Sequence, residues 1–508
     1  MSLARVYSGL VSGVQGEIVT VEVHIDEGLP GTQIVGLPDQ AVTESRERIK
    51  PAIKESGFNY PPKKITVNLS PADKAKEGST YDLPIAIGIL SATGQLEIPG
   101  PELEEWLLAG EIALDGQLRG IPGVLPVGLK GKQEDFRNFV IPKRNAFEAR
   151  PTGLTPAPAG SLREAVGILE GRVTPSMPQD EKRNPESVSV PDFSDVKGQP
   201  MAKRGLELAA AGGHNVLMIG PPGTGKSMLA QRIPGILPSL TREQALETTS
   251  VHSVSGELID NNRLVEIPPF LSPHHTTYGA GLIGGGRVPR PGEVSLAHNG
   301  ILFLDEIPEF QRSILETLRQ PMERGTVSVS RAKATHEFPA NFLLVGAMNP
   351  CPCGFLSHPD RNCRCRPGQI DRYREKLSGP LLDRIDLHIS VGPVDYDSLK
   401  SKNGGKSTSE MKQQVKTVRT IQHERYESRA FHLNSELPPG EIDEFCPLED
   451  DADELLRRAV DDWGYSARTV HRMQKVARTL ADFEKSTLIQ KSHMAEALQF
   501  REFEVSEI

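Results

Sequence analysis

The feature that most constrains this chain is a glycine-rich octapeptide that directly follows an apolar run. Residues 216–219 (Val-Leu-Met-Ile) are typical of a buried strand, and Gly-Pro-Pro-Gly-Thr-Gly-Lys-Ser follows at once. A strand that runs into G-x-x-x-x-G-K-S is the pattern of a phosphate-binding loop. Successive backbone N–H groups of such a turn point at phosphate oxygens, and the next helix adds its positive N-terminal end. The pattern therefore predicts an α/β domain that binds a nucleoside triphosphate.

The residues of this loop have separate expected roles. We expect Lys226 to reach the β- and γ-phosphates and the Ser227 hydroxyl to ligate Mg²⁺. The predicted nucleotide-binding residues are Gly220, Pro221, Pro222, Gly223, Thr224, Gly225, Lys226 and Ser227. The loop predicts nucleotide binding, but it does not say how the energy of the nucleotide is used.

Two acidic residues end a second apolar strand. Residues 301–304 (Ile-Leu-Phe-Leu) are followed directly by Asp305 and Glu306. Asp305 would hold Mg²⁺ through water, and Glu306 would polarise the attacking water as general base. The pair favours hydrolysis over phosphoryl transfer to a small acceptor. The alternative is a strand end with two solvated acids.

A third predicted strand carries an amide at its tip. The strand covers residues 342–347, and Asn349 stands just beyond it, before Pro350. Between the two motifs above, Asn349 would contact the γ-phosphate or the lytic water, as the sensor residue of AAA+ ATPases does. The alternative is an asparagine that only forms a turn before proline.

Two arginines are candidates for completing the site. Arg384 would act as an arginine finger that reaches the nucleotide of a neighbouring subunit, which would require a ring of subunits. The alternative is a structural Arg384 paired with Asp383 or Asp386. Arg468, just after the predicted N-cap Ser466, would be a second sensor that couples lid closure to the γ-phosphate. On nearby faces of the same helix we expect a solvated or DNA-facing surface of Arg472, Lys475 and Arg478.

Length and local pattern predict a chain of three domains. Its 508 residues favour roughly three domains. Alternating strands at 19–25 and 65–69, with a mixed-charge helix at 40–55 between them, indicate an α+β domain first. The predicted division is 1–172, α+β domain; 173–191, linker; 192–398, α/β nucleotide-binding core with a cysteine insert at 351–365; 399–410, polar spacer; and 411–508, helical domain.

Charge and hydropathy narrow the possible partners. The net charge is −9, so any nucleic-acid binding must come from local basic patches. No apolar stretch is long enough to span a bilayer, and no signal-like apolar segment opens the chain. Four of the five cysteines are clustered, which does not fit a disulfide scaffold. We expect a cytoplasmic protein without a membrane partner.

The four clustered cysteines form the pattern C-x-C-x₉-C-x-C. They are Cys351, Cys353, Cys363 and Cys365. Four thiolates suit a tetrahedral Zn²⁺, which would order an insert that has little apolar content of its own. C-x-C pairs are less usual than C-x-x-C in such sites, and His358 is a possible substitute ligand. Reduced thiols and redox-active cysteines are the alternatives.

Several long motifs together resemble the magnesium-chelatase-like AAA+ proteins of bacteria. These motifs are residues 195–199, 209–215, 290–300 and 349–354, and the resemblance spans essentially the whole chain. It implies a homo-oligomeric, hexameric AAA+ ring that uses ATP and Mg²⁺. It further implies an N-terminal Lon-protease-like domain of the ribosomal protein S5 domain 2-like fold and a C-terminal helical lid.

The resemblance also implies a use for the hydrolysis. It implies an ATP-driven DNA helicase that drives branch migration when incoming single-stranded DNA is integrated during natural transformation. A chelatase-type ATPase that remodels a partner for Mg²⁺ insertion into a porphyrin is the alternative. The fused N-terminal domain and the cysteine insert favour the DNA motor, since chelatase ATPase subunits resemble only the central and C-terminal parts.

The N-terminal domain departs from the Lon protease pattern. Thr80 falls at the position of the nucleophilic serine, with Ser79 one residue early, and Leu125 stands where the lysine base should be. Because a hydroxyl without a base is a poor nucleophile, we expect no peptidase activity. Lys130 is the nearby residue that could restore a base. The domain would instead assemble the ring or guide DNA.

Three segments are candidates for contact with single-stranded or branched DNA. Residues 274–287 are glycine-rich with Tyr278, and residues 325–338 form a predicted hairpin that carries Arg331 and Lys333. Segments with mobile glycines, Arg and Lys are suited to follow the phosphate backbone of DNA without reading its bases. Ordinary surface loops are the alternative. The cysteine insert is also basic, through Arg361, Arg364, Arg366, Arg372 and Arg374.

Overall fold

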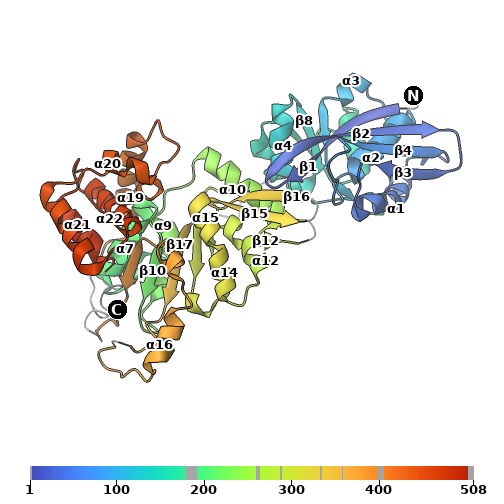
Figure 1. Cartoon of the computed structure of the whole chain (residues 1–508). Helices are drawn as coiled ribbons and strands as arrows, with labels where there is room; N and C mark the ends of the chain where they lie inside the picture. Colours follow the sequence, from blue (N-terminus) through green and yellow to red (C-terminus); the bar gives the residue numbers. More distant parts are fainter. Residues whose placement is uncertain are drawn as a thin grey trace.

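Three parts of the chain lie in a row in the computed structural model (Figure 1). It describes residues 3–178, 191–258, 264–286, 289–331, 334–356, 358–396, 400 and 405–501. An N-terminal α/β part, a central domain with a parallel sheet and a C-terminal helical part follow one another, which confirms the expected fold class. Most of the predicted linker, part of the predicted spacer, Arg287 and Lys333 lie outside the described residues.

A seven-stranded sheet forms the N-terminal part, in the order β3-β4-β2-β1-β5-β8-β9. Its strands are β1 (Leu3–Ser12), β2 (Gln15–Asp26), β3 (Gly31–Val35), β4 (Lys64–Ser70), β5 (Trp106–Leu108), β8 (Asn138–Pro142) and β9 (Thr155–Ala159). β1, β2 and β4 pair antiparallel, and β5, β8 and β9 extend the sheet in parallel. The alternation predicted a half-buried strand at 19–25; in β2, Val19, Val21 and Val23 are fully buried.

Helices cover both faces of this sheet. Accordingly, side chains of β1 pack into two different hydrophobic cores, one on each face. They are α1 (Gln40–Glu55), α2 (Asp82–Ala92), α3 (Gly100–Leu103), α4 (Val124–Gln133), α5 (Ala146–Ala149) and α6 (Leu162–Leu169). A small hairpin pairs β6 (Glu111–Ile112) with β7 (Leu118–Arg119). The predicted helix at 40–55 is α1, which begins after Asp39, whose carboxylate accepts the N–H of Val42 at 2.7 Å.

The residues compared with Lon proteases lie in ordinary structural surroundings. Leu125 is fully buried in α4, and the Lys130 ammonium pairs with Glu134 at 2.7 Å. The Ser79 hydroxyl donates to the Glu111 carboxylate. The lack of peptidase activity stays a prediction, and a basic partner for Thr80 is not among the described hydrogen bonds.

A five-stranded parallel sheet forms the centre of the second part, in the order β11-β14-β17-β10-β18. The strands are β10 (Val216–Ile219), β11 (Phe270–Leu271), β14 (Ile301–Leu304), β17 (Leu343–Met348) and β18 (Leu387–Ser390). All pairs are parallel, and β10 lies between β17 and β18. The carboxyl ends of β10, β14 and β17 therefore meet at one edge of the sheet, where ligands of open α/β sheets bind.

Short helices and two hairpins surround this sheet. The helices are α7 (Pro200–Gly212), α8 (Lys226–Ala230), α9 (Ile233–Ile236), α10 (Arg242–Ser255), α12 (Gly279–Ile283), α13 (Glu293–Leu296), α14 (Arg312–Thr317), α15 (Arg319–Arg324), α16 (Pro367–Arg374) and α17 (Gly379–Leu382). The hairpins pair β12 (Gly284–Gly285) with β13 (Arg290–Pro291) and β15 (Thr326–Arg331) with β16 (Ala334–Pro339). The second of them confirms the predicted hairpin at 325–338.

The C-terminal part is helical and shares a hydrophobic core with the central domain. Its helices are α19 (Thr408–Arg425), α20 (Ile442–Phe445), α21 (Asp450–Trp463), α22 (Ala467–Phe483) and α23 (Lys491–Gln499). The Ser466 hydroxyl accepts the N–H of Thr469 at 3.2 Å, which confirms the predicted N-cap of α22. The predicted apolar period also holds, because Met473, Val476 and Leu480 are buried.

The basic face expected on α22 is not a solvated surface, so that prediction is wrong. Arg478 is only 1% exposed and donates to Asp482 and to the carbonyls of the 486–487 turn. Arg472 pairs with Asp386 at 3.1 Å, and Lys475 donates to the carbonyl of Ser435 at 3.0 Å. The helix turns these cations inward because acids and carbonyls from neighbouring segments neutralise them there.

Among the described residues, the N-terminal part touches the central domain near α4 and near the turn between β1 and β2. The N–H of Gly123, just before α4, donates to the carbonyl of Ser253 in α10 at 3.1 Å. The N–H of Gly13, in the turn between β1 and β2, donates to Nδ1 of His336 in β16 at 3.1 Å. One candidate DNA-contacting hairpin is therefore attached to the N-terminal sheet.

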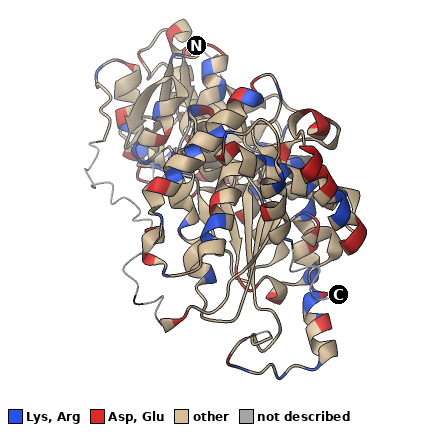
Figure 2. Ribbon diagram, turned by 90° about the vertical axis from the view of Figure 1, so that its left-hand side faces the viewer, with Lys and Arg blue, Asp and Glu red and all other residues tan. Residues whose placement is uncertain are grey.

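Charge is mixed over the molecule. Figure 2 shows Lys and Arg interspersed with Asp and Glu along the helices, in keeping with the net charge of −9. In the part of the chain that the structure describes, none of the helices has the length and apolar character needed to cross a membrane.

Candidate nucleotide-binding site

The phosphate loop joins β10 to α8 in a backbone conformation that depends on glycine. Gly223 and Gly225 have φ angles of +81° and +90°, which side chains other than glycine rarely adopt. The Thr224 hydroxyl donates to the carbonyl of Pro221 at 2.9 Å and ties the turn together. The loop thus ends at the start of α8, where its residues can present N–H groups to an anion.

The lysine of the loop is folded back onto it. The Lys226 ammonium donates to the carbonyls of Gly220 and Pro221 at 2.7 and 2.8 Å, and the residue is 8% exposed. Burial lowers the pKa of Lys226, while the charges of Asp305 and Glu306 oppose this shift. A buried cation held by neutral carbonyls suits an anionic ligand, because phosphate would neutralise it.

The serine of the loop meets the first acid of the second motif. The Ser227 hydroxyl donates to Oδ2 of Asp305 at 2.6 Å, and Oδ1 of Asp305 accepts the N–H of Glu306 at 2.9 Å. A hydroxyl and a carboxylate side by side are the hard oxygen ligands that Mg²⁺ prefers. The donor set therefore fits a magnesium site.

Glu306 stands at the tip of β14 with its carboxylate toward solvent. Its φ is +49°, in the left-handed region, and its side chain is 58% exposed. Nδ1 of His275 lies 4.0 Å from Oε2 of Glu306, and the His275 ring packs edge-on against Phe310. Sequence reasoning missed His275, although it placed this histidine in a candidate DNA-contacting segment.

Asn349 lies at the end of β17, beside the phosphate loop. Its Oδ1 accepts the Lys226 ammonium at 3.3 Å, and the N–H of Gly220 donates to the carbonyl of Met348 at 3.2 Å. The backbone N–H of Asn349 donates to the Tyr373 hydroxyl, although burial raises the pKa of Tyr373 to about 12. The structure thus brings Asn349 together with the loop and the two acids.

Arg384 is buried and paired within its own chain. The residue is 7% exposed, and its guanidinium donates to the Glu323 carboxylate of α15 and to the carbonyl of Pro380. Asp383 and Asp386 were the partners considered from the sequence, and neither is the partner of Arg384. Among the described residues, Nε of Arg384 is buried without a hydrogen-bond partner.

Arg468 is exposed and lies near the same segment. Its side chain is 55% exposed, and its Nη1 is 3.9 Å from Oδ2 of Asp383. Across the described residues, no hydrogen bond or ion pair joins Arg384 or Arg468 to the phosphate loop. The structure of one chain therefore gathers the loop, Asp305, Glu306 and Asn349, but it does not bring the two arginines to them.

A buried network links the segment that carries Arg384 to the sheet and to the lid. Asn215, just before β10, donates to the carbonyl of Arg384 at 3.1 Å and accepts the N–H of Leu344 at 2.9 Å. Its own N–H donates to Asp386 at 3.0 Å. Burial alone would raise the pKa of Asp386, but Arg472 and His214 hold it well below its usual value. Sequence reasoning used Asn215 only as part of a motif.

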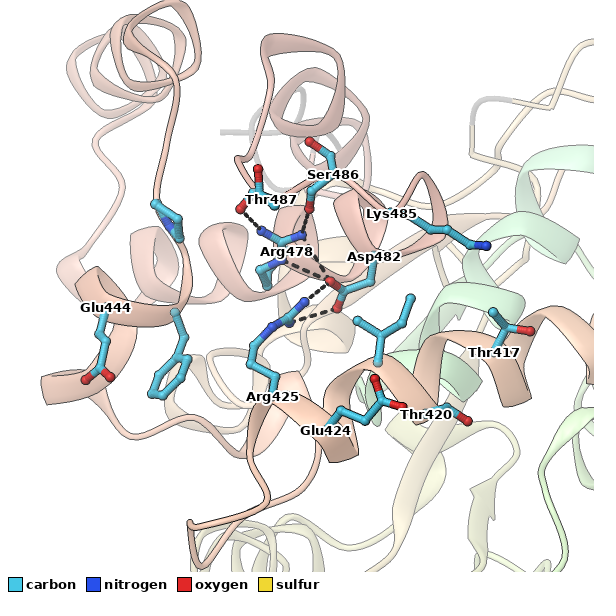
Figure 3. Close-up of a pocket in the computed structure, with 13 residues that line it drawn as sticks. Thr417, Thr420, Glu424, Arg425, Glu444, Arg478, Asp482, Lys485, Ser486 and Thr487 are labelled. Carbon is cyan, nitrogen blue, oxygen red and sulfur yellow. Dashed lines mark hydrogen bonds and ion pairs between the residues drawn. The ribbon is translucent and has the colours of Figure 1, made fainter.

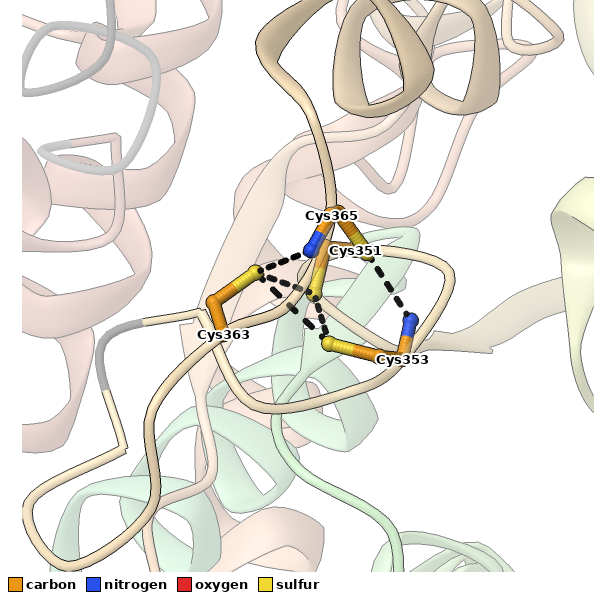
Figure 4. Close-up of side chains that lie close together, drawn as sticks. All are labelled: Cys351, Cys353, Cys363 and Cys365. Carbon is orange, nitrogen blue, oxygen red and sulfur yellow. Dashed lines mark hydrogen bonds between the residues drawn. The ribbon is translucent and has the colours of Figure 1, made fainter.

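The four clustered cysteines face one another (Figure 4). The Sγ atoms of Cys351 and Cys353 are 3.4 Å apart, and each lies 3.6 Å from Sγ of Cys363. The four sulfurs all lie within 4.8 Å of one another, and the thiols are free. Zn–S bonds of about 2.3 Å in a tetrahedron give S–S separations of about 3.8 Å, so the cluster could hold a metal ion.

Backbone N–H groups point at the sulfurs of this cluster. The N–H of Cys353 donates to Sγ of Cys365, and the N–H of Cys365 donates to Sγ of Cys363, both at 3.4 Å. A backbone hydrogen bond from Arg364 lowers the pKa of Cys353 to about 6. Burial and the neighbouring thiols, by contrast, raise the pKa of Cys363 and raise that of Cys365 to about 12. His358, the alternative ligand, is not among the four residues that converge.

A cavity of about 740 Å³ lies in the C-terminal part, between α19, α20 and α22 (Figure 3). Arg425 and Arg478 converge there on the Asp482 carboxylate, which has no exposed surface. The residues that line the cavity belong to the C-terminal helices and their turns, so it is separate from the phosphate loop.

The candidate DNA-contacting segments expose one aromatic side chain and several arginines among the described residues. Tyr278, just before α12, is 80% exposed. In the cysteine insert, Arg361 lies 5.1 Å from the centre of the Phe355 ring, while Arg374 donates to the carbonyl of Pro350 at 3.5 Å. Exposed arginines of this region are Arg361, Arg364, Arg366 and Arg372.

Comparison with known proteins connects the three parts of the chain to one family. Residues 192–399 match the family described as magnesium chelatase, subunit ChlI; residues 21–145 match subunit ChlI of Mg-chelatase; and residues 405–501 match the C-terminal region of that subunit. The chain is 44% identical to competence protein ComM of Haemophilus influenzae over 99% of its length and 98% of that protein.

Two further relatives differ in how much of the chain they share. A protein named YifB of Escherichia coli is 44% identical, over 99% of this chain and 97% of its own length. The magnesium-chelatase 67 kDa subunit of Chlorobaculum parvum is 31% identical over only 41% of this chain and 28% of its own length.

Proposed function

The chain belongs to the magnesium-chelatase-like family that includes ComM and YifB, and on that premise we propose that it is an AAA+ ring motor that hydrolyses ATP to move DNA. The observation that supports this most is the meeting of the phosphate loop with both acids and Asn349 at one sheet edge. A fold alone does not determine an activity, so the proposal depends on this site.

Each residue of the site has a proposed part in ATP hydrolysis. The loop N–H groups and Lys226 bind the phosphates, and Ser227 with Asp305 would hold Mg²⁺, which neutralises phosphate charge when bound. Glu306 accepts a proton from the attacking water, and its exposed carboxylate is free to reach that water. Asn349, already 3.3 Å from the Lys226 ammonium, orients the γ-phosphate or the water.

The proposed ring, a homo-hexamer, completes the site from a neighbouring chain. Arg384 is the proposed finger, because its planar guanidinium suits a phosphate of the adjacent subunit, although in the single chain it is only 7% exposed and is paired with Glu323. To reach it, Arg384 would exchange its Glu323 partner for that phosphate. Arg468, held near Asp383 in the single chain, is the proposed second sensor that moves with the lid.

The proposed substrate is single-stranded or branched DNA. One relative bears the name competence protein, which supports a role as a branch-migration helicase that helps integrate single-stranded DNA in natural transformation. The exposed Tyr278 and the exposed arginines of the cysteine insert suit stacking and phosphate contacts without base reading. The match to chelatase subunits supports the alternative, an ATPase that remodels a partner for Mg²⁺ insertion into a porphyrin.

The remaining parts of the proposal concern zinc and the division of the chain. The four converging sulfurs support a structural Zn²⁺ ion at Cys351, Cys353, Cys363 and Cys365. We retain the proposed domains 1–172, 192–398 and 411–508, with the first a Lon-protease-like domain that does not cleave peptides. Metal analysis of the purified protein tests the zinc site. A content of less than one zinc ion per several chains would contradict it.

One experiment separates the DNA motor from the chelatase-type ATPase. ATP turnover is measured with forked DNA, with single-stranded DNA and without DNA, and DNA binding is measured with and without a non-hydrolysable ATP analogue. The motor proposal expects ATP-dependent DNA binding and a changed turnover. DNA that neither binds in an ATP-dependent way nor alters turnover would favour the alternative.

A further inference from the structure

The segment of residues 351–366, called the cysteine loop here, begins and ends beside the candidate sensor Asn349. Cys351 follows Asn349 by two residues and is fully buried, and α16 begins two residues after Cys365. From α16, the Tyr373 hydroxyl accepts the backbone N–H of Asn349, and Arg374 donates to the carbonyl of Pro350 at 3.5 Å. Both ends of the loop are therefore attached to the tip of β17.

A turn of the cysteine loop rests directly on the phosphate loop. Gly354 has a φ of +82°, and its N–H donates to the carbonyl of Cys351 at 2.9 Å. A Cβ atom on Gly354 would lie 2.5 Å from Cδ and 3.2 Å from Cγ of Pro222. It would also lie 3.8 Å from Cγ of Asn349. Glycine at this position therefore allows a close approach to two parts of the nucleotide site at once.

The cysteine loop has little else to hold its shape. Of its described residues, Cys351 and Gly354 are buried, and all the others between 352 and 366 are exposed or half-buried. The contacts of the Cys351 and Cys353 sulfurs with that of Cys363, at 3.6 Å, and the hydrogen bond from the Cys353 N–H to Sγ of Cys365, at 3.4 Å, join its beginning to its end. A metal ion bound by these sulfurs would close the loop and fix the turn at Gly354, as metals do for small segments without a core.

We propose that this metal-held loop is a positioning element of the nucleotide site. By holding Gly354 against Pro222 and Asn349, it sets the phosphate loop and the sensor relative to each other, so that metal occupancy controls nucleotide binding. The inference rests on the proposed zinc site and on the proposed ATP site. Neither the cysteines nor Gly354 touches the nucleotide in this account, so they are positioning residues.

The first test changes the contact and leaves the sulfurs in place. Gly354→Ala introduces a Cβ into the contact with Pro222. We expect it to raise the Kd of a fluorescent ATP analogue by at least about tenfold, which corresponds to about 1.4 kcal/mol. Zinc content should stay at one ion per chain, and the circular dichroism spectrum should be unchanged.

Two glycines provide matched controls. Gly368→Ala lies in the adjacent helix α16, where a Cβ would meet nothing within 4 Å. Gly464→Ala adds a Cβ at a φ of +66° in open space far along the chain, so it reproduces the backbone strain without the contact. We expect both to leave the Kd unchanged. A control that weakens binding as much as Gly354→Ala would overturn the proposed contact.

A double-mutant cycle tests whether the contact with Pro222 carries the effect. Pro222→Ala removes both ring atoms that approach Gly354. We expect Gly354→Ala to weaken binding much less in the Pro222→Ala background than in the wild type, because the cycle isolates the pairwise interaction. Equal effects in both backgrounds would show that Gly354 acts by another route and would overturn the proposal.

The second test changes the metal and leaves the sequence in place, so it does not depend on the folding of a variant. Zinc is removed from the wild-type protein with a chelator, the Kd is measured, and Zn²⁺ is returned. We expect removal to weaken nucleotide binding about as much as Gly354→Ala does, and return to restore it.

The outcomes separate this inference from the proposals that it rests on. Bound zinc whose removal leaves the Kd unchanged, together with a neutral Gly354→Ala, overturns the positioning role and leaves the zinc site standing. Protein that contains no zinc overturns metal control, even if Gly354→Ala weakens binding. Wild-type protein that does not bind the ATP analogue contradicts the proposed ATP site itself, and with it the inference.

Discussion

Replacing Asp482 by alanine should destabilise the C-terminal helical part strongly. The Asp482 carboxylate has no exposed surface and accepts hydrogen bonds from Arg425, Arg478 and Asn434. The Arg425 and Arg478 side chains, which converge on Asp482 in Figure 3, are themselves only 20% and 2% exposed. Alanine would therefore leave two guanidinium groups in the interior with no carboxylate to neutralise them.

The expected loss of stability follows from the burial of these three side chains. Breaking a buried ion pair by removing one partner costs about 3–5 kcal/mol, because an uncompensated buried charge remains. Arg425 lies at the cavity of about 740 Å³ and can gain some water, so we expect the lower part of that range. Asp482→Asn keeps the acceptor oxygen and loses the charge, and it should cost less than alanine.

Chemical denaturation followed by circular dichroism measures the change. The matched control is Glu454→Ala, which removes an exposed ion pair with Arg458 on α21 and should cost at most about 1 kcal/mol. Because the chain has several domains, midpoints of the transition are compared between variants rather than extrapolated free energies. If Asp482→Ala lowers the midpoint no more than Glu454→Ala does, burial does not make this network costly to break.

Two further predictions concern the ring and the pH dependence of stability. Arg384→Ala and Glu306→Gln chains should each bind ATP and hydrolyse it poorly. Mixing the two variants should restore part of the ATP turnover, because some sites in mixed rings contain both residues. Phosphate release that stays at the level of the separate variants would contradict a finger acting between chains. Burial raises the pKa of Asp82 to about 6, although Arg48 opposes this shift. Because the folded-state pKa is raised, the stability linked to protonated Asp82 is fully present below about pH 4 and is lost as the pH rises through about 6. Asp82→Asn should therefore flatten the pH dependence of the unfolding midpoint between pH 4 and 7, and an unchanged slope would contradict the raised pKa.

Features set by short stretches of sequence could be predicted. The strand at 216–219, the hairpin at 325–338 and the N-cap at Ser466 follow from local periodicity, turn residues and capping chemistry. The gathering of the phosphate loop with Asp305 also follows, because both follow strands that end at the same edge of a parallel sheet.

Features that depend on distant contacts could not be predicted. Arg384 pairs with Glu323, 61 residues away, rather than with the two aspartates beside it. Arg478 has a helical spacing typical of a solvated face, yet segments from outside its helix bury it. The approach of Gly354 to Pro222 joins two loops that only the folded sheet brings together. The sequence gives the type and spacing of the side chains along each element, but it does not give the distant residues that bury or pair with them.

In the proposed motor, ATP hydrolysis at the phosphate loop is coupled to DNA. The most direct test measures the turnover of the wild-type protein with and without forked DNA, alongside Glu306→Gln as the hydrolysis-deficient control. We expect a turnover that changes with DNA in the wild type, together with retained ATP binding and at least about a hundredfold lower turnover in Glu306→Gln. A wild-type turnover that is indifferent to DNA, or a Glu306→Gln variant that hydrolyses ATP normally, would contradict it.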